Sequence, residues 1–271
     1  MKSKIKYGSV ATVFIGLISL ISWTFASKNK GNEQQDFQNL SIKVKPNKDT
    51  FVPGELIELE IEISNKGNTP VKILQGSVDN GFLKVLVSTS EEYKEYFGPG
   101  WGRGDLGTHI TLQPNESYKE NGSILFSCAT DFSHLNEDEA KRMSKGKILT
   151  NYVFTEPGTY LIKAASYVDR DQTKIESDPV QIVVNEPLGD DLKIWKKIKD
   201  DCDFGYLIQQ GDFSDSKRNK KEELVKKVED LLSKHPNGIL ADKLKQNLEK
   251  FKLAEVKRKE FSEKIKIKKN E

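Results

Sequence analysis

Residues 53–71, PGELIELEIEISNKGNTPV, decide the fold class of this chain. Between positions 57 and 63, four apolar residues alternate with three glutamates, which is the period of a β-strand with one buried and one charged face. Pro53-Gly54 precedes the run and Asn65-Lys66-Gly67-Asn68 follows it, and both are turn-forming sequences. The segment therefore predicts a half-buried strand bounded by turns.

Short runs of similar character continue along the chain. Most of them are separated by turn signals and not by helical patterns, which favours a β-sandwich over a parallel α/β sheet. Ser133–Lys145 is the exception and predicts a short surface helix. The further predicted strands are Val71–Leu74, Phe82–Ser88, His109–Leu112, Ser123–Cys128, Ile148–Thr155, Thr159–Val168 and Val180–Val184.

A second motif, EPGTYLI at residues 156–162, matches the immunoglobulin-type pattern acidic-x-Gly-x-Tyr-x-apolar before a late strand. In this pattern the tyrosine hydroxyl bonds back to the backbone at the corner between two strands. Gly158 and Tyr160 are therefore predicted structural residues. Ile162 stands where antibody domains have their second disulfide cysteine, so that bridge is absent.

The stretch from Phe51 to Val71 and the turn LQPNES at residues 112–117 carry a family resemblance. They resemble bacterial Ig-like domains, and are similar both to adhesion-type surface repeats and to the intracellular proteinase inhibitor domain of bacilli. Asn115 replaces the glycine usual in that turn. The resemblance covers residues 40 to 186 and implies a mainly β fold, an immunoglobulin-like antiparallel β-sandwich. It implies no single function, because this fold hosts many unrelated activities.

Residues 1–27 have the pattern of an export signal. Three lysines precede an uncharged, largely apolar run from Tyr7 to Ser27, and the positive charges keep this end cytoplasmic. Small residues at positions 24 and 26 allow cleavage after Ala26, while the length of the run also suffices to span a membrane. We therefore expect an exported protein, either anchored to the cytoplasmic membrane with its bulk outside or, if cleaved, secreted or periplasmic.

The other boundaries follow from changes in composition. Residues 28–38 are polar and predict a flexible spacer, residues 39–186 hold the sandwich, and residues 187–271 predict an α-helical region. An αα-hairpin turns at His235-Pro236-Asn237-Gly238, and the basic tail from Lys257 to Glu271 is expected to fray. The apolar stripes of the helical region are Leu192/Trp195/Ile198, Leu224/Val228/Leu231/Leu232 and Leu240/Leu244/Leu248/Phe251.

The segment at residues 89–107 is the candidate binding loop. Its glycines do not form a phosphate-binding loop, because no Gly-Lys-Ser/Thr follows and no helix begins after it. Aromatic rings in a surface loop favour contact with a ligand, and the alternative is a long connection packed over the sandwich. The candidate binding residues are Tyr93, Tyr96, Phe97, Trp101 and Arg103.

Cys128 and Cys202 are the two cysteines of the chain. Because disulfides persist outside the cytoplasm, a bridge between them would tie the helical region to the sandwich, and two separate thiols are the alternative. A count of thiols on denatured, unreduced protein distinguishes these two states.

The sequence contains no recognisable constellation for catalysis or metal binding. The three histidines and two cysteines include no pair at ligand spacing, and nothing groups a nucleophile with a base and an orienting acid. We therefore expect no catalytic residues, no metal and no cofactor. Nucleic acid is not an expected partner of an exported domain.

These observations favour a non-catalytic cell-envelope binding or scaffold protein. Its expected partners are the membrane, through the N-terminal segment, and a protein or an envelope polymer. An inhibitor or accessory subunit of an exported hydrolase or protease is the alternative, and an enzyme of unrecognised type comes third. Neither the ligand nor the oligomeric state follows from the sequence.

Overall fold

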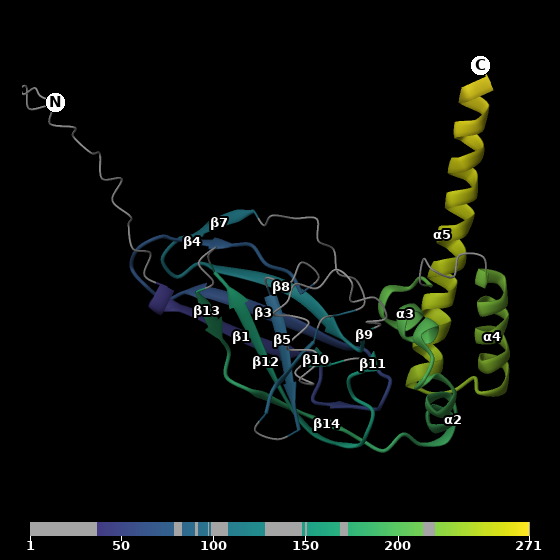
Figure 1. Ribbon diagram of the computed structural model, residues 1–271, viewed down its shortest axis with the longest axis horizontal. Coiled ribbons are helices and arrows are strands. Elements are labelled where there is room, and N and C mark those ends of the chain that lie inside the picture. Colours follow the sequence, from purple (N-terminus) through teal and green to yellow (C-terminus); the bar gives the residue numbers. More distant parts are fainter. Residues whose placement is uncertain are drawn as a thin grey trace, which may run out of the picture. The chain divides into compact units, whose positions relative to one another are not determined.

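The computed structural model describes residues 37–78, 83–89, 92–96, 98, 108–127, 148–149, 151–168, 173–213 and 220–270. Over these residues the protein is mainly β, with several sheets followed by four α-helices (Figure 1). None of the helices in this part of the chain is long and apolar enough to cross a membrane. The predicted signal or anchor at residues 1–27 lies outside the described residues, as does most of the predicted spacer.

The deciding stretch of sequence forms β3 (Ile57–Asn65), the middle strand of an antiparallel three-stranded sheet. Its neighbours are β1 (Leu40–Pro46) and β8 (Ser117–Ile124). The four alternating apolar residues of β3 are at most 2% exposed, whereas the glutamates between them lie on the outer face. The predicted half-buried strand is therefore confirmed.

The larger sheet has the order β10-β6-β5-β12-β14-β2, with β13 also paired to β12. Two short ladders, β4–β7 and β9–β11, complete the β part of the protein. The bounds are β2 (Thr50–Phe51), β4 (Val71–Leu74), β5 (Leu83–Ser88), β6 (Lys94–Tyr96), β7 (His109–Leu112), β9 (Phe126–Ser127), β10 (Ile148–Leu149), β11 (Asn151–Tyr152), β12 (Gly158–Tyr167), β13 (Lys174–Glu176) and β14 (Val180–Val184).

The inner faces of the two larger sheets share one hydrophobic core. Its fully buried members are mostly branched aliphatic residues, such as Ile61 from β3, Val85 from β5 and Ile162 from β12. Tyr160 lies at the margin of this core with its ring buried, and its hydroxyl donates a hydrogen bond of 2.8 Å to the carbonyl oxygen of Glu156. This is the backbone contact that the sequence pattern predicts for that tyrosine.

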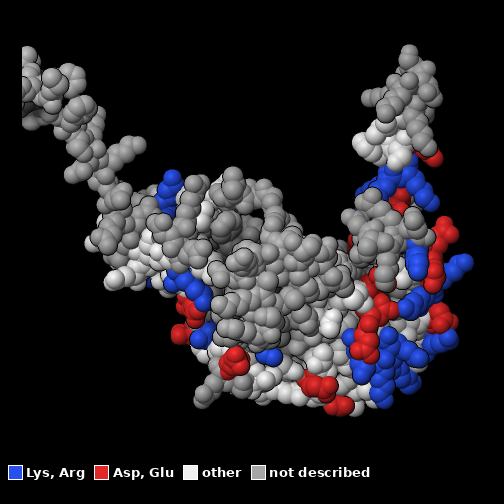
Figure 2. All heavy atoms as spheres, in the orientation of Figure 1, with Lys and Arg blue, Asp and Glu red and all other residues white. Residues whose placement is uncertain are grey.

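Four helices follow the sheets: α2 (Gly189–Ile198), α3 (Cys202–Gln210), α4 (Lys221–Lys234) and α5 (Ile239–Asn270). The predicted hairpin is formed by α4 and α5. α3 was not predicted, because its nine residues include a glycine and its apolar stripe, Phe204, Leu207 and Ile208, spans little more than one turn. Charged side chains of both signs crowd the face of the helices seen in Figure 2. The expectation of a frayed end after Lys257 is wrong, since α5 continues to Asn270.

Two sequence predictions in the β part need correction. The segment at residues 89–107 is not a surface loop throughout, because residues 94–96 form β6, which pairs with β5. A three-residue strand is too short for its period to be recognised. β8 begins six residues before the predicted Ser123, and its inward positions 118, 120 and 122 are not aliphatic, which hides the alternation. The predicted helix Ser133–Lys145 lies outside the described residues.

Candidate functional site

The helices pack directly on one end of the β part. Phe126 of β9 and Tyr152 of β11 belong to the hydrophobic cluster of the helices, and the Tyr152 ring meets that of Trp195 edge-on at 5.0 Å between centroids. Gly205 of α3 faces Phe126 so closely that a Cβ there would lie 2.5 Å from Cγ of the ring. The helices therefore form a fixed wall beside the sheets.

Gln209, near the end of α3, holds the helices against the sheets by hydrogen bonds. Its Nε2 donates to the Tyr96 hydroxyl at 2.5 Å, and its Oε1 accepts from the backbone N–H of Phe126 at 2.9 Å. The Tyr96 hydroxyl in turn donates to the carbonyl oxygen of Phe126 at 3.1 Å. Gln209 thus joins α3 to β6 and β9 in a partly buried hydrogen-bond network. Such networks hold their elements in one arrangement when each member is satisfied.

Asn247 fixes α5 against α3 in the same way. Its Nδ2 donates to the carbonyl oxygens of Leu207 and Ile208 at 2.9 and 2.7 Å, near the C-terminal end of α3. The Leu207 carbonyl also accepts from the backbone N–H of Gly211 at 2.9 Å, so the buried amide of Asn247 adds a second bond there and supplies a partner to the carbonyl of Ile208. Both helices of the wall therefore have defined positions relative to each other.

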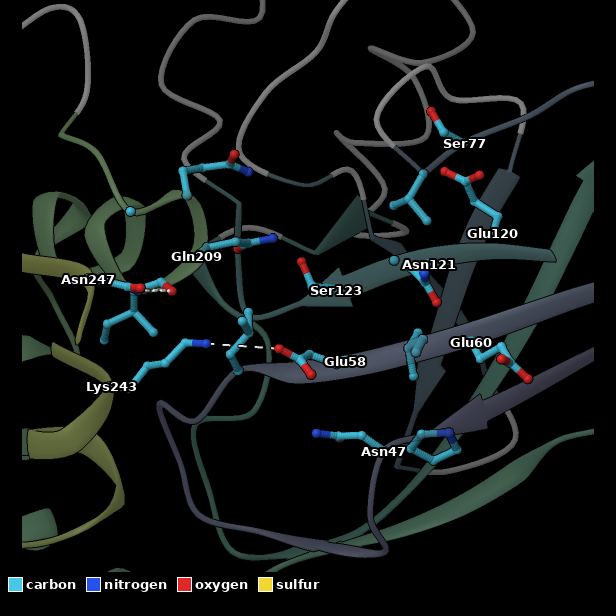
Figure 3. Close-up of a pocket in the computed structure, with 18 of the residues that line it drawn as sticks. Asn47, Glu58, Glu60, Ser77, Glu120, Asn121, Ser123, Gln209, Lys243 and Asn247 are labelled. Carbon is cyan, nitrogen blue, oxygen red and sulfur yellow. Dashed lines mark hydrogen bonds and ion pairs between the residues drawn. The ribbon is translucent and has the colours of Figure 1, made fainter. Parts of the chain in front are cut away.

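A cleft of about 820 Å³ lies between this wall and the outer face of the three-stranded sheet (Figure 3). Its floor includes Lys45, Glu58, Glu60, Asn121 and Ser123, which the strand register places in neighbouring rows on that face. Its helical side is formed by Gln209, Gln210, Lys243, Asn247 and Lys250. The volume falls in the range of ordinary ligand sites, but the lining is mostly polar.

Charges of both signs meet in the cleft. Lys243 of α5 points across it towards Glu58 of β3, with 3.9 Å between Nζ and Oε1 (Figure 3). Glu60 pairs with Lys119 at 2.9 Å. Lys45 and Lys250 form no ion pair with any described residue, so two ammonium groups remain available to an incoming polar chain.

The cleft also follows the edge of β8. Four successive residues of this strand, 120 to 123, line it, and successive residues of a strand point to opposite faces. Because side chains from both faces of β8 line the cleft, the cleft runs along the backbone edge of this strand. Among the described strands, none pairs with the side of β8 that faces away from β3. The opposite edge strand of this sheet, β1, is in contact with β12, β13 and β14 of the larger sheet.

β8 is also the longest strand at the end of a described sheet path, with eight residues against seven for β1 and two each for β10 and β2. Proteins usually shorten or cover edge strands, because unpaired N–H and C=O groups invite pairing with another chain. Gly122 of this strand lies under Val78, and a Cβ at that position would be 2.8 Å from Cγ2 of the valine. Val78 therefore occupies the space that a side chain at position 122 would need.

Of the residues proposed as a binding loop, the structure describes Tyr93 and Tyr96, and neither lines the cleft. Tyr93 is half-buried, with Nζ of Lys163 4.7 Å from its ring centroid, and it does not line the cleft. The prediction for Tyr96 is wrong, since its side chain belongs to the core and is 2% exposed. Phe97, Trp101 and Arg103 lie outside the described residues.

Of the two cysteines, Cys202 is half-buried at the start of α3, and Cys128 lies outside the described residues. The predicted disulfide therefore stays a prediction. Sequence reasoning missed the cleft because its residues come from β1, β3, β8, α3 and α5. The one available signal was the row of glutamates on β3, which marks a polar face but not what stands opposite it. No group of three or more metal-binding side chains occurs in the described part of the chain.

No protein-family model and no curated protein matches this chain. Among solved structures it is similar to the sporulation control protein Spo0M from Bacillus subtilis, with 9% identity and a TM-score of 0.29, over 64% of this chain and 54% of that one. A β-glucosidase, EmGH1 from Erythrobacter marinus, matches at 11% identity and a TM-score of 0.27, over 54% of this chain and 15% of the enzyme.

The alkylpurine DNA glycosylase AlkC from Pseudomonas fluorescens matches at 8% identity and a TM-score of 0.28, over 54% of this chain and 30% of the glycosylase. In all three cases the chain spans about half or less of the length of the protein that it matches. At these scores the similarities carry no argument about fold or function.

Proposed function

We propose that this protein is a non-catalytic binding or scaffold protein of the cell envelope, and that its cleft receives an extended segment of a partner protein. The export pattern of residues 1–27 supports the location, with the folded part outside the cytoplasmic membrane. The β part is, in this proposal, an immunoglobulin-like sandwich. The pattern around Tyr160 and the hydrogen bond from its hydroxyl to Glu156 support that assignment.

The edge of β8 beside the cleft, with which no described strand pairs, is the observation that carries the proposal. An extended peptide can add a strand to such an edge, where main-chain hydrogen bonds supply affinity and side-chain contacts supply specificity. The polar lining fits a peptide better than an apolar small molecule. Lys45 and Lys250 would favour a segment that carries carboxylates.

The alternative function is that of an inhibitor or accessory subunit of an exported hydrolase. Such a protein would bind the hydrolase through the same edge of β8. The two differ in outcome: an inhibitor lowers the activity of its partner in a purified mixture, and a scaffold leaves that activity unchanged. A catalytic role has no supporting arrangement of side chains in the cleft, whose charged residues are of both signs and at least partly exposed.

Site-specific photocrosslinking in intact cells tests the proposal. A benzophenone amino acid at Asn121, in the cleft, should give a covalent adduct of discrete mass, and the same residue at Thr111 on β7 is the matched exposed control. Lys45→Glu and Lys250→Glu together should weaken the adduct. Equal adducts from both positions, or none from Asn121, would contradict a partner in this cleft.

A further inference from the structure

The C-terminal part of α5 carries most of the large apolar side chains that are exposed in the described residues. Of six such side chains, four lie between positions 253 and 265 of this helix. Phe261 is 66% exposed and Ile265 is 41% exposed, which are high values for a phenylalanine and an isoleucine. Phe261 and Ile265 are one helical turn apart and form an exposed apolar patch, and such patches mark places of contact.

α5 leaves the other helices near Arg258. Up to that point it is held by the Phe251 ring against Phe213, by Glu255 against Lys221, and by Arg258, whose guanidinium donates to Asp212 at 2.7 Å. Beyond Arg258, the described side chains form no hydrogen bond or ion pair with another element. The end of the helix extends away from α2, α3 and α4 in Figure 1.

This end of the helix is two-sided. At about 100° per residue, Phe261 and Ile265 lie on one face, and Lys257 and Lys264 flank them within about 80°. Glu260 and Glu263 lie about 120° and 180° away from the middle of the apolar pair. Residues 257–270 contain seven Lys or Arg and two Glu, a net charge of +5. The apolar pair is therefore bordered by cations, and the acids are on the other side.

We propose that residues 257–270 of α5 lie on an anionic lipid bilayer, with Phe261 and Ile265 at the boundary between headgroups and acyl chains. Apolar side chains bordered by lysines are the pattern of helices that lie in this interface, where the lysine stems reach up to the phosphates. A soluble polyanion would satisfy the lysines but offers no apolar phase to Phe261 and Ile265. The inference goes beyond the proposed function, since it uses neither the cleft nor a protein partner.

Amide hydrogen exchange on the full chain in lipid nanodiscs tests this contact. Discs of phosphatidylcholine alone are compared with discs that also contain phosphatidylglycerol, so that the N-terminal segment is inserted in both. We expect exchange at residues 257–270 to slow by about tenfold only with the anionic lipid. Lys257→Gln and Lys264→Gln should each reduce the lipid affinity of the segment by about fivefold.

Phe261→Ser with Ile265→Ser should remove the protection, whereas Val256→Ser, an equally exposed apolar residue on another face, should leave it unchanged. Circular dichroism without lipid checks that the variants fold, which is expected because these side chains are exposed. Equal protection in neutral discs, equal protection by soluble polyphosphate, or protection without lipid that rises with protein concentration would each overturn the proposal. None of these outcomes bears on the cleft.

Discussion

The two hydrophobic cores of this protein differ in composition. The core between the sheets is mostly aliphatic and draws on strands spread over the β part of the chain. The core of the helices is rich in aromatic rings, and three of its residues, Leu125, Phe126 and Tyr152, come from the β part. The helices thus use the end of the sheets as part of their own interior, and the cleft exists because this junction holds both sides in place.

The side chains of the two cores pack in different ways. Branched aliphatic residues on paired strands fill the space between two sheets with little dependence on any one contact. At the junction, large rings meet glycines: Phe126 packs on Gly205 and Trp195 packs on Gly54, with no room for a side chain at either glycine. A junction of this kind is sensitive to single changes, because packed interiors relax only partly around a cavity or a clash.

The largest expected effect is at Phe126, which is 1% exposed and contacts both parts of the molecule. Phe126→Ala should lower the free energy of unfolding by about 3 to 5 kcal/mol through the cavity it leaves. Urea unfolding followed by circular dichroism should show one transition at a lower midpoint. Phe261→Ala is the control, since that ring is exposed. Two separate transitions in the wild-type protein would break the view that helices and sheets unfold together.

Tyr160 tests the aliphatic core at its margin. Tyr160→Ala should cost about 3 kcal/mol from the lost ring, and Tyr160→Phe about 1 kcal/mol from the lost hydrogen bond to Glu156. Tyr167→Phe, at the end of the same strand, is the matched control and should be neutral. Thermal melting of the three variants measures the differences. If Tyr160→Phe melts at the wild-type temperature, the hydrogen bond at this corner contributes nothing.

Asp191 of α2 tests how much one hydrogen-bonded contact contributes to the stability of the helices. Its carboxylate accepts hydrogen bonds from the backbone N–H groups of Ile239 and Leu240 at 3.2 and 2.9 Å, so one helix caps the start of another. Asp191→Ala should cost about 1 kcal/mol, the usual value of a lost N-terminal cap. Asp200→Ala, an exposed acid with no such role, is the control in urea unfolding. An equal loss in both variants would exclude the cap as the cause.

The smallest expected effect is a loss of stability at acidic pH through Glu255. The ammonium of Lys221 donates to Glu255, and Arg258 adds a second contact, so the pKa of that carboxyl is held below its ordinary value. A lowered pKa contributes stability that is present above the ordinary value near 4.5 and is lost as the pH falls through the folded value. Because the pair is partly exposed and screened, we expect about 0.5 kcal/mol or less. Wild type and Glu255→Gln should differ in unfolding free energy at neutral pH and converge at low pH.

Several strands and helices were predictable because the hydrophobic periodicity of their own residues indicates them. The alternation at positions 57–63 depends only on which side chains prefer burial, so β3 and its buried face followed directly. The stripes at positions 224–232 and 240–251 predicted α4 and the first half of α5 for the same reason. β6 and α3 were missed because they are short and are stabilised by contacts with distant residues. Gln209 and Tyr96 are 113 positions apart, and nothing near either one announces their hydrogen bond.

The sequence by itself determined a mainly β protein with a helical region at its end, since hydrophobic periodicity is a local property of the chain. The position of the cleft, the placement of α3 and α5 beside the outer face of β3 and β8, and the course of the cleft along the edge of β8 depend on tertiary packing. The physical reason is that the cleft is made by juxtaposition. One side of the cleft is the polar outer face of the three-stranded sheet, and the other is a polar surface of α3 and α5. The two form a site only because aromatic packing at the junction brings them together.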